Sequence, residues 1–150
     1  MSKVLMSLPV GERVGIAFSG GLDTSFCAIY LRETTGSEIV SVCVDTGGFQ
    51  PGELDHVSTR AQAAGVRDHR TVDGTRAVYE RFVSYLIKGN CLRGGVYPMC
   101  VGAERVVQAE EVVRVAIDVG ATGIAHGSTG AGNDQVRFDV AIRTLAPHLK

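Results

Sequence analysis

The chain has no lysine between Lys3 and Lys88. A Walker phosphate loop, G-x-x-x-x-G-K-[ST], needs a lysine that reaches the outer phosphates of the nucleotide, so such a loop is excluded from this stretch. The dinucleotide-binding fingerprint G-x-G-x-x-G is missing too, because residues 20–23 read Gly-Gly-Leu-Asp where the fingerprint would stand. Two common nucleotide-binding loops are therefore excluded.

The cysteines lack the spacing of a metal site. No pair shows C-x-x-C spacing, which argues against a zinc site and against a disulfide framework; the four are Cys27, Cys43, Cys91 and Cys100. Cys27 and Cys43 lie in apolar stretches, so we expect both to be reduced core residues. We assign no metal-ligating residues.

Long apolar runs and an excess of charge are missing as well. No run approaches the ~20 residues of a membrane span, and residues 1–9 lack a signal-peptide pattern. We therefore expect a cytoplasmic protein without a membrane partner. The net charge is −1, which provides no electrostatic footprint for nucleic acid or for an anionic membrane.

What the chain does have is apolar residues and glycine. At 150 residues with a hydrophobic fraction of 45%, it fits one domain with a proper core. Its 19 glycines exceed average usage, which is about 7%. They cluster at 20–21, 47–48, 94–95 and 127–132, which indicates several close approaches between backbone and ligand.

Residues 17–25, Ala-Phe-Ser-Gly-Gly-Leu-Asp-Thr-Ser, follow an apolar strand and open a helix. Two glycines let the backbone come close to a ligand, and free N–H groups at a helix start point at negative charge. Ser19, Thr24 and Ser25 add hydroxyl donors. We expect a phosphate or pyrophosphate here. The alternative is a plain strand–helix junction in which Ser19 and Asp23 cap the helix.

Apolar strands alternate with helices along the chain. Strands are expected at 13–18, 39–44, 67–72 and 122–126, and helices at 23–33, 53–64, 75–87, 102–119 and 135–145. A glycine-bearing loop is expected near 88–97. Repeated strand–helix units with an apolar strand at 39–44 predict an α/β fold with an open parallel sheet of about four to five strands and helices on both faces.

Two helices carry apolar stripes that we expect to face the sheet. In the helix 23–33 the stripe is Phe26, Ile29 and Tyr30. In the helix 102–119 apolar residues recur at a spacing of three to four, and they are Val106, Ala109, Val113 and Ala116.

A second glycine-rich segment, residues 125–138, follows the last strand and reads Ala-His-Gly-Ser-Thr-Gly-Ala-Gly-Asn-Asp-Gln-Val-Arg-Phe. Asn133, Asp134 and Arg137 can bind a zwitterion, because they offer both charges and an amide. Taken alone, the segment fits a flexible loop equally well. In a parallel sheet, loops at the carboxyl ends of the strands converge on one ligand, so this segment and the first loop can act together.

The two segments carry a resemblance to known families. The S-G-G-x-D-[ST]-S pattern resembles the pyrophosphate loop of the N-type ATP pyrophosphatases, which cleave ATP between the α and β phosphates. Together the segments closely resemble argininosuccinate synthase, from about Val14 to the end of the chain. The resemblance implies a Rossmann-like fold of the adenine nucleotide alpha hydrolase type. It also implies an ATP-dependent C–N ligase of arginine biosynthesis.

In this family citrulline is joined to aspartate, and ATP is converted to AMP and pyrophosphate. The citrulline ureido oxygen attacks the α-phosphate, and the aspartate amine then displaces AMP. This chemistry needs positioning and charge neutralisation rather than a protein nucleophile. The resemblance implies ATP and Mg²⁺ as cofactors, with the metal bridging the phosphates.

The resemblance also implies roles for single residues. ATP would be cradled by Ala17, Phe18, Ser19, Gly20, Gly21, Leu22, Asp23, Thr24 and Ser25, with Val44 beside the adenosine and Gly127 near the nucleotide; Asp23 and Ser25 are the candidate catalytic residues. Aspartate would be bound by Thr129, Asn133 and Asp134, and citrulline by Asn133, Arg137 and Tyr97. Arg105 fits a carboxylate partner, or equally a solvated helix arginine.

The chain departs from the family pattern. Gly102 and Ala131 stand where members commonly have a serine and a lysine, so a citrulline contact and a phosphate-facing charge are expected to be missing.

Members are much longer, and a fifth strand is expected soon after Leu149. We therefore expect residues 1–150 to be the nucleotide-binding domain, without the C-terminal synthetase and oligomerisation domain. This domain should bind ATP–Mg²⁺ weakly, make little product alone and self-associate, the full-length family being tetrameric.

Two other functions remain open. One is another pyrophosphatase-loop enzyme that forms amides or thiolates tRNA; thiolation would need catalytic cysteines near the nucleotide and a basic face, and neither is evident. The other is a nucleotide-binding module without catalysis, whose partner is supplied in trans.

Overall fold

Four parallel strands form the main sheet of the computed structural model, which describes residues 8, 10–130 and 132–150. Their order is β3 (Asp68–Asp73), β2 (Glu38–Asp45), β1 (Arg13–Ala17) and β6 (Gly123–His126). All three pairs are parallel, which confirms the expected sheet. The chain moves from β1 toward β3, whereas β6 lies on the other side of β1. Strand order therefore reverses between β1 and β6, and parallel sheets bind ligands at such a point.

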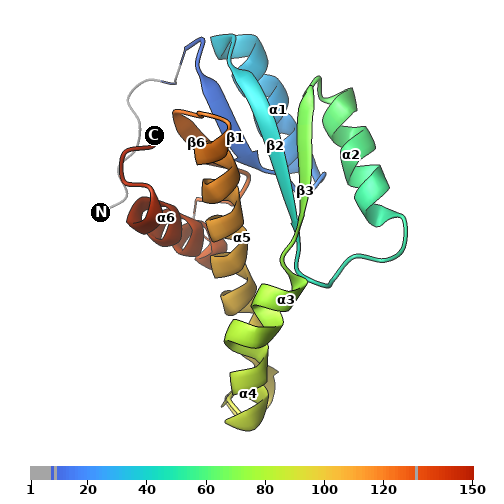
Figure 1. Cartoon of the computed structure of the whole chain (residues 1–150), viewed down its shortest axis with the longest axis vertical. Coiled ribbons are helices and arrows are strands. Elements are labelled where there is room, and N and C mark those ends of the chain that lie inside the picture. Colours follow the sequence, from blue (N-terminus) through green and yellow to red (C-terminus); the bar gives the residue numbers. More distant parts are fainter. Residues whose placement is uncertain (1–7, 9, 131) are drawn as a thin grey trace.

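Helices cover both faces of the sheet (Figure 1). On one face, α1 (Leu22–Thr35) and α2 (Glu53–Ala63) pack over the inward side chains of β1. On the other face lie α5 (Cys100–Asp118) and α6 (Asn133–Leu145). The side chains of β2 divide between the two layers: Ile39 and Cys43 face α1 and α2, whereas Val40, Val42 and Val44 face α5. Burial on both faces explains the continuous apolar run of this strand.

An arm projects beyond the carboxyl end of the sheet, at the bottom of Figure 1. It consists of α3 (Thr75–Val78), the π-helical turn η1 (Tyr79–Val83), α4 (Ser84–Lys88) and an antiparallel pair, β4 (Leu92–Arg93) and β5 (Tyr97–Pro98). The helix expected at 75–87 is thus present with a π-helical turn inside it. The pair β4–β5 stands where we expected only a loop.

The buried side of α1 differs in part from our expectation: of the three expected residues only Ile29 packs against the core, and it is half-buried. Its buried residues are Thr24, Ala28, Leu31 and Thr35, whereas Phe26 is 62% and Tyr30 45% exposed. The two rings instead stack on each other, with centroids 5.6 Å apart. The hydropathy of the helix alone therefore does not decide which side of α1 is buried.

Two smaller expectations also need correction. On α5, Val107 is buried and Val106 only half-buried, although Ala109, Val113 and Ala116 are buried as expected. Cys43 is a core residue, but Cys27 is half-buried. The wide buried stripe of α5 reflects its position between the sheet and α6, both of which it contacts.

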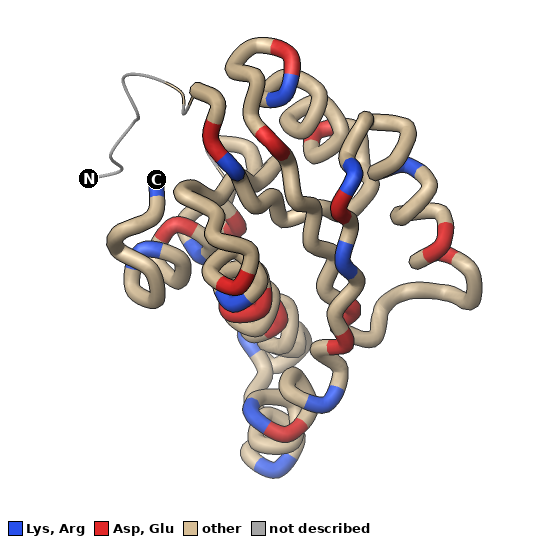
Figure 2. The backbone as a smooth tube through the Cα atoms, turned by 45° about the horizontal axis from the view of Figure 1, so that its top comes forward, with Lys and Arg blue, Asp and Glu red and all other residues tan. Residues whose placement is uncertain are grey.

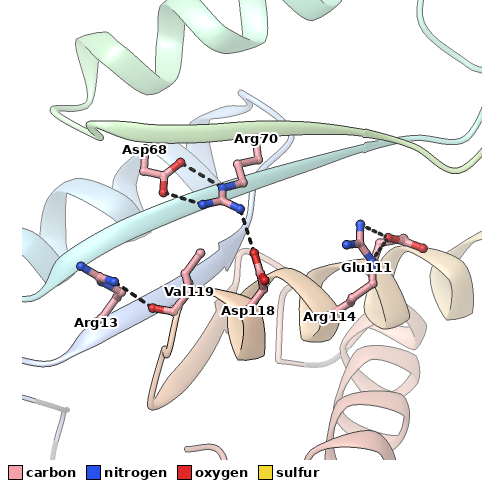
Figure 3. A network of polar contacts seen from close by, with 7 residues as sticks. All are labelled: Arg13, Asp68, Arg70, Glu111, Arg114, Asp118 and Val119. Atoms are coloured by element: carbon pink, nitrogen blue, oxygen red, sulfur yellow. Dashed lines mark hydrogen bonds and ion pairs between the residues drawn. The ribbon is translucent and has the colours of Figure 1, made fainter.

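Charged side chains tie α5 to the sheet at the amino end of the strands (Figure 3). Arg70 of β3 donates to Asp68 and to Asp118 at the end of α5, with 3.2 Å between Arg70 Nη1 and Asp118 Oδ2. Arg13 donates to the carbonyl of Val119 at 2.8 Å. These groups are largely solvent-exposed, so water and salt screen each pair strongly. Positive and negative side chains are interspersed along the chain (Figure 2).

The last residue pairs with the outer side of β6. Lys150 donates its N–H to the carbonyl of Thr122 at 3.0 Å and accepts from the N–H of Ile124 at 2.9 Å, the pattern of a parallel pair. This is the place at which a fifth strand is expected.

None of the helices in the described ranges combines the length and the apolar character that crossing a bilayer requires.

Candidate functional site

The loop after β1 presents hydrogen-bond donors at the start of α1. Gly20 has a φ of +73°, a conformation that glycine adopts readily, and Gly21 precedes the first helical residue. The N-cap residue of this helix is Gly21, and no side-chain cap hydrogen bond is formed there, so neither Ser19 nor Asp23 is its N-cap. The N–H groups of a first helical turn have no partner within the helix, so they remain available to an anion.

Two hydroxyl groups lie over this loop. Ser19 Oγ is 3.4 Å from the backbone nitrogen of Gly21 and 3.5 Å from Thr24 Oγ1. Thr24 donates to the carbonyl of Gly21 at 3.2 Å, and its side chain is buried. In contrast, Leu22 and Asp23 are exposed and Ser25 is half-buried. The loop therefore has a buried inner side, formed by Thr24, and an open outer side, which includes the exposed Ser19.

The loop after β6 touches the loop after β1. A β-carbon added to Gly127 would lie 2.9 Å from Thr24 Cγ2 and 3.0 Å from the backbone nitrogen of Thr24. No side chain fits between the loops at this point. The two segments that the sequence singled out are therefore in direct contact, although about a hundred residues separate them along the chain.

A cavity of about 210 Å³ opens beside this contact. Eight of the residues singled out from the sequence line it: Ala17, Phe18, Ser19, Thr24, Val44, Arg105, Gly127 and Asp134. The rest of the wall comes from the sheet, from α5 and α6 and from the loops, and includes Val42, Cys43, Phe49, Gln108, Val112, Ser128 and Phe138. One side of the cavity is thus apolar, and the other carries hydroxyl, amide and charged groups.

Asp134 stands between two arginines at the rim of the cavity. Its carboxylate accepts from Arg137 Nη1 at 2.7 Å and lies 3.1 Å from Arg105 Nε. Arg105 also contacts Glu104 at 3.1 Å and Gln108 at 3.0 Å, so it is a paired arginine rather than a solvated one. Burial raises the pKa of Asp134, but hydrogen bonds from Arg137 and Arg105 outweigh it and hold the pKa below its usual value. The carboxylate is therefore ionised at neutral pH.

A second, shallower hollow continues from the cavity across the last loop. It is lined by Asp23, Val101, Thr129, Asn133, Asp134 and Arg137, among others. The candidate substrate residues of 125–138 therefore lie together, next to the loop of residues 17–25, the candidate phosphate loop. A β-carbon on Gly102 would lie 3.5 Å from Arg137 Nε, so a serine at this position would stand beside the guanidinium.

Tyr97 lies apart from this group, and Ala131 is outside the described residues. Tyr97 belongs to β5 on the projecting arm and is 51% exposed. It lines neither hollow. The described chain alone therefore does not bring Tyr97 to the other candidate substrate residues.

Two contacts at the site were not foreseen from the sequence. Arg60 of α2 donates from Nη1 to the carbonyl of Gly20 at 3.0 Å. The ring of His126 stacks on Phe138, with centroids 5.3 Å apart; its Nδ1 accepts from the N–H of Ser128 at 3.3 Å, and Asp139 lies 3.5 Å from its Nε2. The contacts of His126 could have been suspected from the sequence, because this residue directly precedes Gly127. No local sequence pattern marks Arg60.

No group of three or more histidine, cysteine, aspartate or glutamate side chains that could hold a metal ion occurs in the part of the chain that the structure describes.

Comparison with known proteins identifies relatives of this chain. The chain is 44% identical over 138 residues to argininosuccinate synthase from Saccharolobus solfataricus, covering 92% of this chain and 35% of the relative. It is 44% identical over 141 residues to argininosuccinate synthase from Methanocaldococcus jannaschii, covering 93% and 35%. The chain spans about a third of the length of these curated relatives.

Two solved structures share the fold at low sequence identity. A U34-tRNA thiolase from Methanococcus maripaludis matches 80% of this chain and 39% of its own, with a TM-score of 0.54 and 20% identity. A predicted subunit of tRNA methyltransferase from Methanocaldococcus jannaschii matches 81% of this chain and 55% of its own, with a TM-score of 0.55 and 20% identity. Residues 13–150 match the family described as arginosuccinate synthase N-terminal HUP domain. The chain belongs to this family.

Proposed function

We propose that this chain is the ATP-binding part of an argininosuccinate synthase, which joins citrulline to aspartate and converts ATP to AMP and pyrophosphate. The observation that carries the proposal is the contact between Gly127 and Thr24. This contact brings the phosphate loop and the glycine-rich loop of residues 125–138 together at the reversal of strand order, where parallel sheets bind their ligands.

The two ends of the cavity suit the two ends of ATP. Val42, Val44 and Val112 form an apolar wall that suits the adenosine, and Ser19 and Thr24 with the N–H groups of α1 suit the phosphates. The cavity volume of about 210 Å³ is smaller than the ~300–1,000 Å³ usual for ligand pockets. We therefore place the adenosine inside the cavity and the phosphates along its rim, beside residues 19–25.

Mg²⁺ fits this site if it arrives with the nucleotide. Mg²⁺ keeps several waters and is usually held by one or two carboxylates together with substrate phosphates. The described residues offer no complete ligand set, and the exposed Asp23 on the first turn of α1 is the carboxylate of this loop that would hold the ion. When bound, the metal would neutralise charge on the pyrophosphate leaving group.

The hollow beside the phosphate loop suits the two amino-acid substrates. Arg137 offers a guanidinium to a carboxylate, and Asp134 offers a carboxylate to an ammonium group. Thr129 and Asn133 add neutral hydrogen-bonding groups on the same side. These residues would hold aspartate and citrulline so that the ureido oxygen faces the α-phosphate, and such positioning supplies much of the rate enhancement.

The chain spans only about a third of its relatives, so other parts of the full protein would complete the substrate site. Tyr97 lies on the projecting arm and is exposed, and the proposal is that it meets such a part. We therefore expect residues 1–150 to make little or no argininosuccinate alone. A cytoplasmic location and a homo-oligomeric assembly are part of this proposal.

Isothermal titration of the chain with ATP and Mg²⁺ tests the proposal. We expect saturable binding that Asp23→Asn and Gly20→Ala weaken about tenfold or more, because Ala is strained at a φ of +73°. Gly48→Ala is the control, because its β-carbon would meet nothing within 4 Å. Binding that neither loop variant alters would contradict the nucleotide assignment. Product formation by the isolated chain at the rate of a complete enzyme would contradict the need for further parts.

A further inference from the structure

Arg60 connects α2 to the phosphate loop through a single hydrogen bond. Its Nη1 donates to the carbonyl of Gly20 at 3.0 Å. A β-carbon on Gly20 would lie 3.4 Å from Arg60 Cδ and 3.4 Å from Val57 Cα, so the arginine stem lies along the bare face of this glycine. Arg60 forms no ion pair within the described ranges. Its charge is therefore not neutralised by a neighbouring carboxylate.

This bond fixes the direction of one peptide group. In a trans peptide, the carbonyl and the N–H of the next residue point in opposite directions. With the Gly20 carbonyl held toward α2, the N–H of Gly21 points away from α2 and toward Ser19 Oγ, 3.4 Å away. Ser19 lines the cavity, so this N–H points to the side where the phosphates would lie.

The same peptide group lies between two glycines, and this makes its direction easy to reverse. Glycine adopts positive and negative φ almost equally well, so no side chain opposes rotation of the Gly20–Gly21 peptide. A reversed peptide would turn the carbonyl oxygen, instead of the N–H, toward the phosphates. An electrostatic attraction would then become a repulsion.

We propose that Arg60 is a positioning residue that locks the Gly20–Gly21 peptide with its N–H directed at the phosphates of the nucleotide. The inference rests on the proposed function, because it takes the anion to be ATP. It assigns to α2 a function beyond covering the sheet. Arg60 acts through the backbone of the loop and not by taking part in the reaction.

Arg32 provides a matched control for this function. It also donates from Nη1 to a backbone carbonyl, that of Ala64, at 2.8 Å. It lies beside Gly36, Glu38 and Gly65, at the amino end of the strands and therefore on the far side from the loop. Arg32→Gln removes a similar bond without touching the phosphate loop.

The test compares Arg60→Gln, Arg60→Lys and Arg32→Gln in the chain by titration with ATP–Mg²⁺ and with AMP. We expect Arg60→Gln to weaken ATP binding about tenfold or more, the scale for loss of a hydrogen bond that involves a charged group. AMP lacks the pyrophosphate and should lose clearly less affinity. Arg60→Lys should restore part of the affinity, and Arg32→Gln should bind ATP like the unmodified chain.

The amide resonance of Gly21 in the ligand-free chain supplies a second measurement. Arg60→Gln should shift it and Arg32→Gln should not, because only the first frees the peptide. If the unmodified chain binds ATP while Arg60→Gln binds it equally well and leaves the Gly21 amide unshifted, the inference is wrong. If the unmodified chain fails to bind ATP, the proposed function is wrong, and the Gly21 amide still decides whether Arg60 fixes the peptide.

Discussion

Gly127 lies so close to Thr24 that a β-carbon on it would stand 3.0 Å from the Thr24 backbone nitrogen. The nitrogen belongs to the first turn of α1 and cannot move without moving the phosphate loop. The loop that follows β6 therefore contacts the loop that follows β1 directly. This contact forms one edge of the cavity in which we place ATP.

Gly127→Ala should separate the two loops. Overpacking of this kind typically costs about 1–3 kcal/mol, so we expect a lower free energy of unfolding and about tenfold or greater loss of ATP affinity. Urea denaturation and calorimetric titration measure the two effects. Gly130→Ala in the same loop is the control, because its β-carbon would meet nothing within 4 Å. Equal behaviour of the two variants would contradict the close contact.

The exposed aromatic pair on α1 should contribute little to stability. Phe26 is 62% exposed, so Phe26→Ala should change the free energy of unfolding by less than about 1 kcal/mol. Leu31 on the buried side is 8% exposed, and Leu31→Ala should cost about 2–5 kcal/mol. Chemical denaturation of both variants compares the two sides of the helix. If Phe26→Ala lost more free energy of unfolding than Leu31→Ala, the side of α1 that carries Phe26 would face the core, as the sequence led us to expect.

The fold could be predicted because its interior strand β2 is buried on both faces. Between Ile39 and Val44 only Ser41 is polar, which marks an interior parallel strand. The orientation of α1 could not be predicted in the same way, because the helix buries Thr24 and Ala28 and leaves its largest apolar side chains outside. The side of a helix that faces a sheet depends on tertiary packing, which the hydropathy of the helix alone does not encode.

In the candidate site, the features with a local sequence pattern could be predicted, and the contacts that depend on tertiary packing could not. Each of the two loops is one continuous segment, residues 17–25 and residues 125–138, and each carries a local sequence pattern. Both loops were therefore recognisable from the sequence. Arg60 was not, because it reaches Gly20 from a helix 40 residues away and nothing around it differs from a solvated helix surface. The pairing of Asp134 with Arg105 likewise depends on how α5 and α6 pack.

The pKa of Asp134 predicts a change of stability at acidic pH. Burial raises this pKa, but hydrogen bonds from Arg137 and Arg105 bring it below its ordinary 3.8. The ionised carboxylate therefore stabilises the folded chain above pH 3.8, and this contribution disappears as the pH falls through the lowered pKa. The side chain is 39% exposed, so the contribution is below about 1 kcal/mol.

The variant Asp134→Asn has no carboxylate at this position, so its stability lacks the pH dependence that this group contributes. The difference in free energy of unfolding between the unmodified chain and Asp134→Asn should therefore shrink as the pH is lowered from neutral into the range below 3.8. Urea denaturation across this range measures it. A difference that stays constant would show that the two arginines do not stabilise the charged carboxylate.

Cysteine reactivity should follow burial. Burial and the nearby Asp45 raise the pKa of Cys43 to about 11, and only the thiolate reacts with alkylating agents. Cys91 is exposed. In the folded chain at mildly alkaline pH, iodoacetamide should label Cys91 and leave Cys43 unmodified, as followed by mass spectrometry of peptides. Labelling of Cys43 at a similar rate would place it outside the core.

The most direct test of the account is a titration of isotopically labelled chain with ATP and Mg²⁺, followed by the amide resonances of each residue. Binding at the carboxyl ends of β1 and β6 predicts that the largest shifts fall on Ser19 to Ser25 and on Gly127 to Thr129, with smaller shifts near Val44. The region around Arg32 and Gly65, at the opposite end of the strands, should not respond. Shifts concentrated there, or no saturable shifts at all, would contradict the proposal that these two loops bind ATP.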